Sequence, residues 1–593
     1  MEKVSPIRGG SFMVMETDPK EVFIPEEFDE EQRMIAQTCQ DFLDTEVFPI
    51  LDRIDSQEEG LMPSLLEKAG ELGLLGISIN EEYDGFGQSF VTSMVASEVI
   101  GAGYSFAVAF SCHTGIGSLP IAYYGNDLQK KRYLPKLATG EWKGAYCLTE
   151  PGAGSDANAG KTRATLTADG THYILNGQKM WITNAGFADV FTVFAKIDDD
   201  RVLSAFIVER GFEGITFNPE EKKMGIKGSS TRQIFFNDVK VPVENLLGGR
   251  GQGYRIALNI LHMGRLKLGG NVIGAAKNAV LQSVRYANER KQFGMLISNF
   301  GSIQHKLAQQ VVRTFATESA VYRASKNVDQ VASAYEFDCE KEQAVISAFA
   351  QMAIEAAILK VYGSEALDYI ADEAVQIFGG MGFSAEMPVD RGYRDSRINR
   401  IFEGTNEINR ILVVDTLLKR GQKKEIPLYE SAAEAYGALS GKAQPEVMPE
   451  SYFERKQFRL VRLKKLTLAL LHSLINKFDR KWMFEQEILN NLSDMIMGIY
   501  VAESSLLRVW KLDSMPSVAN QELRKNIVDV LVHDVTGAVE KSARDAIYSF
   551  AEGTDLELLV SALERWVIYE PVNVKELRRQ IASRMIEENR YIY

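Results

Sequence analysis

The spacing of hydrophobic residues along this chain changes several times, and each change predicts a different kind of structure. From about residue 29 to 143, apolar residues recur every three or four positions, as in amphipathic helices. Asp29 followed by Gln32 forms a capping-box signal at the start of this region. We therefore expect an N-terminal α-helical domain over 27–144, preceded by an extended arm over 1–26. The first helical face consists of Met34, Ile35, Cys39, Phe42 and Leu43.

Between residues 145 and 247, short runs of alternating apolar and polar residues predict β-strands. Asn176-Gly177 and Asn237-Asp238 read as turns that end two of these runs, and the aspartates at 198–200 read as a third turn. This pattern predicts a small antiparallel β-domain. The apolar runs lie at 172–175, 191–194, 204–208 and 233–236.

The helical period returns after Gly248-Gly249 and is rich in alanine, which favours a long four-helix bundle over 248–420. Residues 421–450 are polar and contain three prolines, so we expect a linker there. An extra C-terminal helical domain follows over 451–593. The predicted fold class is α+β, mainly α. The four bundle helices are expected at 253–292, 303–331, 334–362 and 365–377.

The C-terminal domain begins with a basic amphipathic helix, in which cationic residues alternate with leucines. Such a helix could lie on an anionic membrane surface, which would give the protein a peripheral membrane contact. The alternative is a helix that packs on its own protein with a solvated basic face. Both interpretations remain open from the sequence. The basic residues are Arg455, Lys456, Arg459, Arg462, Lys464 and Lys465.

Composition narrows the classes of function. A length of 593 residues indicates several domains, and a net charge of −13 argues against a nucleic-acid partner. The four cysteines lie far apart and the six histidines show no ligand spacing, so no metal site or disulfide framework is expected. The N-terminus lacks the apolar core of a signal peptide, and no long apolar run predicts a membrane span. We expect a bacterial, cytoplasmic enzyme.

The strongest candidate for chemistry is the carboxylate of Glu403, within the stretch RIFEGTNEI. It lies between the apolar pair Ile401-Phe402 and Gly404. Partial desolvation by such neighbours raises the pKa of a carboxyl group, which suits a general base. The alternative is an exposed acidic turn between two helices.

Two stretches of the predicted β-domain suit the binding of a flat ring. Residues 146–156 form a glycine-containing loop with the hydroxyls of Thr149 and Ser155, which is either a ligand loop or a tight surface loop. Trp181 and Thr183 lie two residues apart on an alternating strand, and so on one face. That face could stack on a heterocycle, or the tryptophan could pack in the sheet core.

Two stretches of the predicted bundle suit the binding of phosphate. Arg290, in ERKQFG, is a candidate phosphate clamp, because a guanidinium matches phosphate oxygens. Gly379-Gly380, in QIFGGMGF, would allow a ligand to approach the backbone. Each is alternatively a helix end or a surface arginine.

Together, YCLTEPGAGSD, KMWITNAG, ERKQFG, QIFGGMGF and RIFEGTNEI resemble the acyl-CoA dehydrogenases from about residue 27 to 420. The segment KKMGIKG at 222–228 and the helical tail make the chain most similar to the very-long-chain branch of that family. The resemblance implies FAD, bound between the β-domain and the bundle. It implies the α,β-dehydrogenation of long-chain fatty acyl-CoA to trans-2-enoyl-CoA in fatty acid β-oxidation. It also implies a homodimer and transfer of electrons to an electron-transfer flavoprotein.

The resemblance also implies roles for individual residues, with Glu403 as the catalytic base steadied by Arg265. Some relatives carry the base at the position of Gly264, where this chain has none. The residues expected around the flavin ring are Tyr146, Cys147, Leu148, Thr149, Gly154, Ser155, Trp181, Ile182 and Thr183. Those expected at the pyrophosphate and adenosine are Arg290, Phe293 and Gln304, and those that reach the flavin of a neighbouring subunit are Gln376, Ile377, Phe378, Gly379 and Gly380. Thr405, Asn406 and Glu407 complete the FAD site, and Ser155, His262, Met263, Gly264, Arg265, Phe402 and Gly404 line the acyl-CoA site.

Two other functions remain open from the sequence. An acyl-CoA oxidase would use the same base and flavin but pass electrons to O₂. A non-catalytic scaffold on the same fold would require loss of the base or of the flavin site, and neither is lost here. The preferred length of the acyl chain is open too. Gly101 and Gly103 either leave room for a long acyl tail or serve as turn residues.

Overall fold

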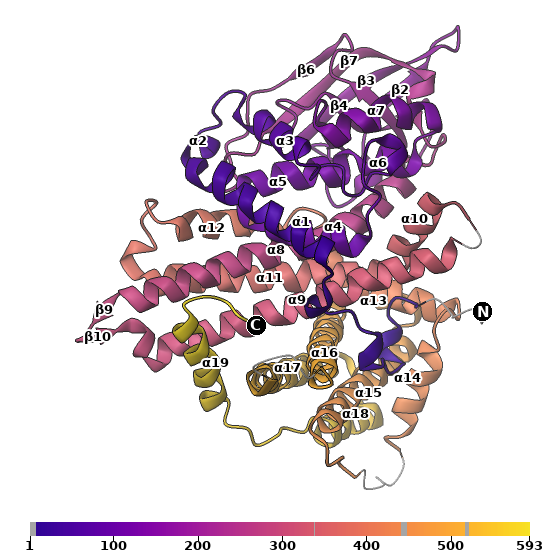
Figure 1. Ribbon diagram of the computed structural model, residues 1–593. Coiled ribbons are helices and arrows are strands. Elements are labelled where there is room, and N and C mark those ends of the chain that lie inside the picture. The colour runs from indigo at the N-terminus through magenta and orange to yellow at the C-terminus, as the bar shows by residue number, and fades with distance from the viewer. Residues whose placement is uncertain (1–6, 337–338, 441–446, 516–520) are drawn as a thin grey trace.

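The computed structural model describes residues 7–336, 339–440, 447–515 and 521–593. In Figure 1 the β-domain lies at one end of the molecule, with the N-terminal helices between it and the long helices of the bundle. The C-terminal helices cover the opposite side of the bundle. The predicted sequence of helical domain, β-domain, bundle and extra helical domain is confirmed.

The N-terminal domain begins as the sequence predicts. The Asp29 carboxylate accepts a hydrogen bond from the Gln32 backbone N–H at 2.8 Å, and the Gln32 side chain accepts one from the Asp29 N–H at 3.2 Å. This capping box starts the first helix. The helices are α1 Glu30–Phe42, α2 Leu51–Asp55, α3 Leu61–Glu71, α4 Phe90–Ile100, α5 Ser105–Ser111, α6 Leu119–Tyr124 and α7 Asp127–Thr139, with the 3₁₀ turn η7 Gly101–Gly103 and the π-helix η8 Cys112–Gly117.

The β-domain is a mixed sheet rather than a purely antiparallel one. Its strand order is β6-β7-β3-β2-β4-β5-β8, and β4 pairs in parallel with both β1 and β2. The other pairs of this sheet are antiparallel. The strands are β1 Gly144–Cys147, β2 Arg163–Leu166, β3 His172–Thr183, β4 Val190–Ile197, β5 Ser204–Glu209, β6 Ile215–Phe217, β7 Thr231–Pro242 and β8 Leu246–Leu247.

Two of the predicted turns are wrong, because the residues at both lie inside long paired strands. The register of β3 on β7 shifts between Leu175 and Gly177, and Asn176 donates a hydrogen bond from Nδ2 to the Asp238 carboxylate at 2.9 Å. Asp238 has a φ of 52°, so the turn-forming residues serve a β-bulge here. The predicted turn at 198–200 is confirmed, since β4 and β5 pair antiparallel on either side of it.

The bundle contains three long helices that lie side by side. Tyr286 of α8 stacks on Phe378 of α11, with ring centroids 4.0 Å apart, so the C-terminal ends of these two helices lie together. The break predicted between residues 362 and 365 is wrong, because α11 runs through it and the chain breaks at Met352 instead. The predicted helix 334–362 also includes 337–338, outside the described residues. The helices are α8 Gly253–Glu289, α9 Gly301–Tyr335, α10 Lys341–Gln351, α11 Ala353–Phe378, α12 Pro388–Ser396 and α13 Asn406–Gln422, with the short β9 Lys291–Gln292 and β10 Met295–Leu296.

The expected linker contains a helix, α14, which ends at Gly437 and packs against α15. The sequence suggested that the basic face of α15 either binds a membrane or is exposed to solvent. In the structure this face points into the protein. Lys456 pairs with Asp529 at 2.6 Å, and Lys464 pairs with Glu503. Lys456, Arg459, Arg462 and Lys464 are all buried, so most of this face packs inside the protein instead of facing solvent. The C-terminal helices are α14 Leu428–Gly437, α15 Tyr452–Phe478, α16 Gln486–Asp513, α17 Gln521–Phe550, α18 Gly553–Trp566 and α19 Val574–Glu588.

A buried charge network joins the C-terminal domain to the rest of the molecule. Arg508 of α16 pairs with Glu26 of the N-terminal arm at 2.8 Å and with Glu318 of α9 at 2.5 Å. Glu318 also pairs with Lys277 of α8, which pairs with Glu98 of α4 at 2.6 Å. The arm therefore packs between domains, with its 3₁₀ turns at Ser11–Met13, Pro19–Glu21 and Pro25–Glu27.

One helical stretch among the described residues, Ser105–Tyr124, passes a test for a membrane span by length and apolar composition, contrary to the expectation of none. However, 83% of it is buried inside the fold, as in the core helix of a soluble protein. A second, bent pair of helices, Lys341–Gln351 and Ala353–Met381, passes only if counted as one span.

Candidate active site

Glu403 lies in the turn between α12 and α13, and its side chain lines a pocket between α8, α11 and the N-terminal helices. Its φ is 58°, a conformation that costs free energy for a residue other than glycine and is often found at functional sites. Its carboxylate oxygen Oε2 is buried and has no hydrogen-bond partner in the described part of the chain. The exposed acidic turn is therefore excluded.

Burial raises the pKa of Glu403 to about 7, while Arg265 and Lys360 partly oppose the increase. A carboxyl group with a pKa near neutrality is well suited to act as a general base at physiological pH. The Arg265 Nε donates a hydrogen bond to the Glu403 backbone carbonyl at 3.0 Å. Arg265 therefore holds the turn and also favours the ionised carboxylate.

Gly264 provides the space for that carboxylate. A Cβ atom added at position 264 would lie 2.9 Å from Glu403 Oε2. With a side chain at position 264, the Glu403 carboxylate would have to move from its present place. The glycine therefore affects where the carboxylate lies, as well as being unable to act as a base itself.

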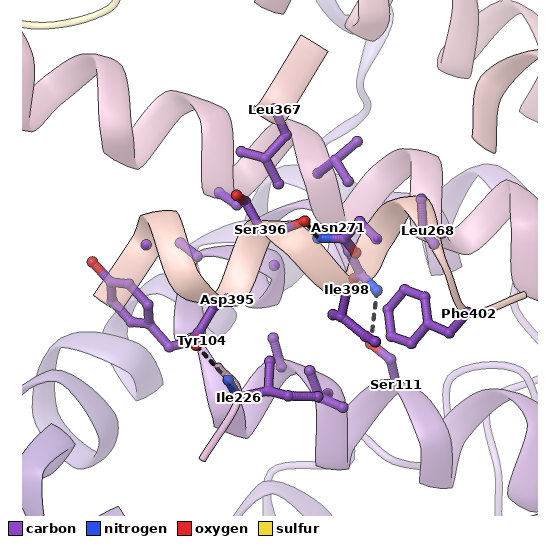
Figure 2. Close-up of a pocket in the computed structure, with 18 of the residues that line it drawn as sticks. Tyr104, Ser111, Ile226, Leu268, Asn271, Leu367, Asp395, Ser396, Ile398 and Phe402 are labelled. Carbon is purple, nitrogen blue, oxygen red and sulfur yellow. Dashed lines mark hydrogen bonds between the residues drawn. The ribbon is translucent and has the colours of Figure 1, made fainter. Parts of the chain in front are cut away.

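The pocket is long and runs along α8. Its lining extends from Met263 and Glu403 at one end to Gln282 and Tyr104 at the other. Nineteen residues of α-helix separate Met263 from Gln282, which corresponds to about 28 Å. Figure 2 shows Phe402 and Leu268 toward one end of the group drawn and Tyr104 toward the other.

Gly101 and Gly103, for which the sequence suggested either a pocket or a turn, have different roles. Gly101 lines the pocket, and a Cβ there would lie 2.2 Å from the Asn271 carbonyl oxygen, so glycine allows η7 to pack closely on α8. Gly103 does not line the pocket and packs beside Leu43.

The β-domain places a second group of predicted residues at this site. Tyr146 and Leu148 pack with the bundle core, whereas Cys147 points into the sheet core. The Tyr146 hydroxyl is buried without a partner among the described residues, and burial together with Glu403 raises its pKa. Cys147 could contribute only its backbone to a ligand.

Trp181 and Thr183 lie at the end of β3, where this strand reaches the pocket. Thr183 lines the pocket, and Trp181 is 60% exposed with a φ of 58°, so the tryptophan is not in the sheet core. Ile182 is buried between them. Lys179 and Glu150 form a buried ion pair at 2.7 Å that ties the loop after β1 to β3, a role that the sequence did not reveal.

Family comparisons agree with this geometry. Models of the acyl-CoA dehydrogenase N-terminal, middle and C-terminal domains match residues 29–141, 145–239 and 251–418, and a further C-terminal model of the family matches 462–565. A "Probable acyl-CoA dehydrogenase" of Bacillus subtilis (strain 168) is 42% identical over 98% of this chain and 98% of its own length. The chain belongs to the acyl-CoA dehydrogenase family.

Two further relatives fit that assignment. The crystal structure of an acyl-CoA dehydrogenase complexed with FAD from Bacillus anthracis shares 43% identity, with a TM-score of 0.95 over 99% of this chain and 100% of that one. The human mitochondrial very long-chain specific acyl-CoA dehydrogenase is 44% identical over 58% of this chain and 51% of its own length.

The stretch after Glu403 shows how this acyl-CoA dehydrogenase holds the turn that carries Glu403 in place. The Thr405 side chain caps α13, and Glu407 is exposed in its first turn. Asn406 is buried: its Oδ1 accepts a hydrogen bond from Lys360 at 2.6 Å, and its Nδ2 donates to Ser364 at 3.0 Å. Asn406 and Lys360 therefore fix the position of the turn. Nothing in the sequence pointed to Lys360.

The remaining residues predicted for acyl-CoA lie around Arg265. His262 Nδ1 lies 3.2 Å from Arg265 Nη1, Met263 and Phe402 line the pocket, and Gly404 has a φ of 86°. Gly154 and Ser155 lie apart from them, on an exposed loop that does not line the pocket.

The residues predicted at the pyrophosphate lie far from Glu403 within one chain. Arg290 follows Arg265 by 25 residues along α8, a separation of about 38 Å. Phe293 and Gln304 lie beside Arg290, and Gln376, Ile377, Phe378, Gly379 and Gly380 lie at the same end of the bundle. A single cofactor beside Glu403 could not also contact this group in the same chain.

Replacing Gly264 with alanine is expected to lower kcat/KM by about 100-fold, because the new Cβ displaces the carboxylate by a fraction of a bond length or more. The control is Gly437→Ala, where nothing lies within 4 Å of the added atom. Steady-state kinetics of the two holoenzymes test this expectation. Equal kcat/KM values for the two variants would show that Glu403 does not depend on this contact.

Proposed function

We propose that this protein is an FAD-dependent dehydrogenase that converts long-chain fatty acyl-CoA to trans-2-enoyl-CoA in fatty acid β-oxidation. The observation that carries the proposal is the buried carboxylate of Glu403, which lines a long pocket with no partner of its own. Family membership and the similarity to an acyl-CoA dehydrogenase complexed with FAD support the cofactor.

The β-domain residues near the pocket fit a flavin. An exposed tryptophan two residues from the pocket-lining Thr183 suits a flat ring, and the Tyr146 hydroxyl, buried without a partner among the described residues, lies close enough to Glu403 to be affected by its charge. Gly152 and Gly154 have no neighbouring atoms within 4 Å of an added Cβ, so a ligand can approach their backbone. Bound FAD supplies the hydride acceptor.

The residues of the chain account for the proton transfer. Glu403 removes the proton from the carbon next to the thioester carbonyl, and Arg265 and Lys360 stabilise the carboxylate before the transfer. In this proposal the backbone N–H of Glu403 stabilises the negative charge that develops on the carbonyl oxygen. Removing one such donor typically costs about 3–4 kcal/mol. Apolar lining residues such as Phe402, Met263 and Leu268 limit the access of water to the reacting carbons.

The length of the pocket supports a long acyl chain. At about 1.2 Å per bond of an extended chain, the 28 Å alongside α8 would hold about twenty bonds. Anaerobic mixing of the FAD-loaded protein with saturated acyl-CoA of increasing chain length tests this. We expect bleaching of the flavin to be most efficient with long chains. Absence of bleaching by every member of the series would contradict the proposal.

We also propose a homodimer in which each bundle end completes the FAD site of the other subunit. The bundle end carries exposed apolar side chains: Phe293 is 94% and Phe383 is 90% exposed. Large exposed apolar groups commonly mark an interface. This arrangement would give Arg290, Gln304 and residues 376–380 a cofactor to bind, although they lie far from Glu403 of their own chain.

We propose that an electron-transfer flavoprotein reoxidises the reduced flavin. We also propose that the protein is cytoplasmic. The four cysteines are free thiols, which suits a reducing compartment. Rapid release of hydrogen peroxide on mixing with acyl-CoA in air would instead favour an oxidase.

The rate of proton abstraction should follow the ionisation of Glu403. Because its pKa is raised to about 7, we expect kcat/KM to rise about tenfold per pH unit below 7 and to level off above it. The same shift makes the ionised form unfavourable in the folded state, so this group lowers stability as pH rises from 4.5 through 7. A pH profile that is flat from 5 to 9 would rule out Glu403 as the base.

A further inference from the structure

Lys267 lies inside the proposed acyl pocket, and no charged group of residues 7–336, 339–440, 447–515 or 521–593 forms an ion pair with it. Its side chain is 5% exposed, and it lines the pocket one helical turn from Gly264. Within the described part of the chain, its ammonium has no hydrogen-bond or ion-pair partner. Burial lowers the pKa of Lys267 to about 8, so the protonated form still predominates at neutral pH. A buried, unpaired ammonium is costly unless a ligand satisfies it.

The other buried lysines of this protein do have partners. Lys179 pairs with Glu150 at 2.7 Å, Lys456 pairs with Asp529 at 2.6 Å, and Lys360 donates to Asn406 at 2.6 Å. Lys267 therefore differs from these buried lysines, because it has no such partner in the described part of the chain.

Asn271, the next turn of α8, adds a second unsatisfied group to the same wall. Its Nδ2 donates a hydrogen bond to Ser111 Oγ at 2.9 Å, as Figure 2 shows, which leaves Oδ1 as the free end of the amide. That oxygen is buried and has no partner among the described residues. The pocket thus offers a donor on Lys267 and an acceptor on Asn271, four residues apart on one helix face.

Other residues that line the pocket are apolar, among them Leu367, Ala371, Ala374 and Val389. A plain hydrocarbon chain would cover these residues well. It would also leave the Lys267 ammonium and the Asn271 Oδ1 without a hydrogen-bond partner. An acyl chain with an oxygen near Lys267 and Asn271 would contact the apolar residues and also form hydrogen bonds with these two side chains.

The position of that oxygen follows from the helix. Lys267 and Asn271 lie three and seven residues beyond Gly264, or about 4.5 and 10.5 Å along α8 from the carboxylate of Glu403. At about 1.2 Å per bond of an extended chain, this range corresponds to about four to nine bonds beyond the carbon that Glu403 deprotonates.

We propose that Lys267 and Asn271 form a polar subsite that recognises an oxygen substituent on the acyl chain, about four to nine bonds beyond the α-carbon. The proposal rests on the proposed function and narrows its substrate to hydroxyacyl- or carboxyacyl-CoA thioesters. Either oxygen accepts a hydrogen bond from Lys267 Nζ, and a hydroxyl also donates one to Asn271 Oδ1. The carbon–oxygen group is bound and does not react.

The test compares octanoyl-CoA with two thioesters of the same carbon number, 8-hydroxyoctanoyl-CoA and the mono-CoA thioester of octanedioic acid. Their terminal oxygens fall within the proposed range. We expect the holoenzyme to show a kcat/KM about tenfold or more higher for at least one oxygenated thioester, the effect typical of leaving a buried polar group unpaired. The faster of the two identifies a hydroxyl or a carboxylate as the preferred group.

Two variants at position 267 provide the matched comparison. Lys267→Met keeps the length of the side chain and removes its charge, so we expect it to reverse the preference toward octanoyl-CoA. Lys267→Arg keeps the charge, so the preference should remain. Asn271→Leu is expected to weaken selection of the hydroxyl more than that of the carboxylate.

The wild-type ratio alone can overturn the proposal, even if a variant does not fold. Equal or higher kcat/KM for octanoyl-CoA would contradict the subsite but leave the dehydrogenase function intact. Failure of all three thioesters and of the saturated series to bleach the flavin would instead contradict the proposed function itself.

Discussion

Replacing Glu403 with glutamine is expected to lower the rate of flavin reduction by about 10⁴-fold while FAD remains bound. Glutamine has nearly the same shape but cannot accept the α-proton. The Glu403 Oε2 makes no hydrogen bond among the described residues, so the change should disturb the fold little. Stopped-flow absorbance of the holoenzyme mixed anaerobically with acyl-CoA measures the effect.

The control for this variant is Glu434→Gln, an exposed acid on α14. It should reduce the flavin at the wild-type rate. Rapid bleaching by Glu403→Gln would remove this carboxylate from the mechanism, and loss of FAD from that variant would show that Glu403 has a structural role.

Replacing Arg508 with methionine is expected to destabilise the protein by about 3–5 kcal/mol. The substitution removes a 2% exposed guanidinium and leaves Glu26 and Glu318 buried with fewer partners. Arg508 also lies over the ring of Phe315, with its guanidinium 4.2 Å from the centroid. Because this network joins the arm, the bundle and the C-terminal domain, the loss should loosen all three. The urea concentration at which helicity is lost measures the change.

The matched control is Arg53→Met, which removes an arginine that also pairs with a glutamate, Glu58, but at the surface. Exposed ion pairs contribute little, so this variant should unfold like the wild type. If Arg508→Met unfolds at the same urea concentration as Arg53→Met, the buried network does not hold the domains together.

Sequence alone predicted the order of the domains and a desolvated carboxylate at Glu403, because both depend on local patterns. Helical periodicity and the capping box at Asp29 identify helices directly, and the apolar neighbours of Glu403 indicate a desolvated carboxylate. The bulges at Asn176 and Asp238 were misread as turns because bulges and turns use the same residues.

Features that depend on partners far away along the chain could not be predicted from the sequence. The basic face of α15 is buried because acidic residues from α16, from α17 and from Glu570 meet it, and these lie about 40 to 115 residues away along the chain. Likewise, nothing near Lys360 or Lys267 in the sequence indicates that one supports the turn of Glu403 and the other faces the pocket. The parallel pairing of β4 with β1 and β2 depends on the three-dimensional path of the chain.

The most direct test of the central claim is an isotope effect on flavin reduction. The wild-type holoenzyme is mixed anaerobically with acyl-CoA that carries deuterium or hydrogen at the α-carbon, and the first turnover is followed by absorbance. If Glu403 removes the α-proton in the step that reduces the flavin, the deuterated substrate will bleach the flavin several times more slowly. Equal rates for the two substrates, at a pH where reduction depends on the ionisation of Glu403, would contradict the claim that Glu403 removes the α-proton in this step.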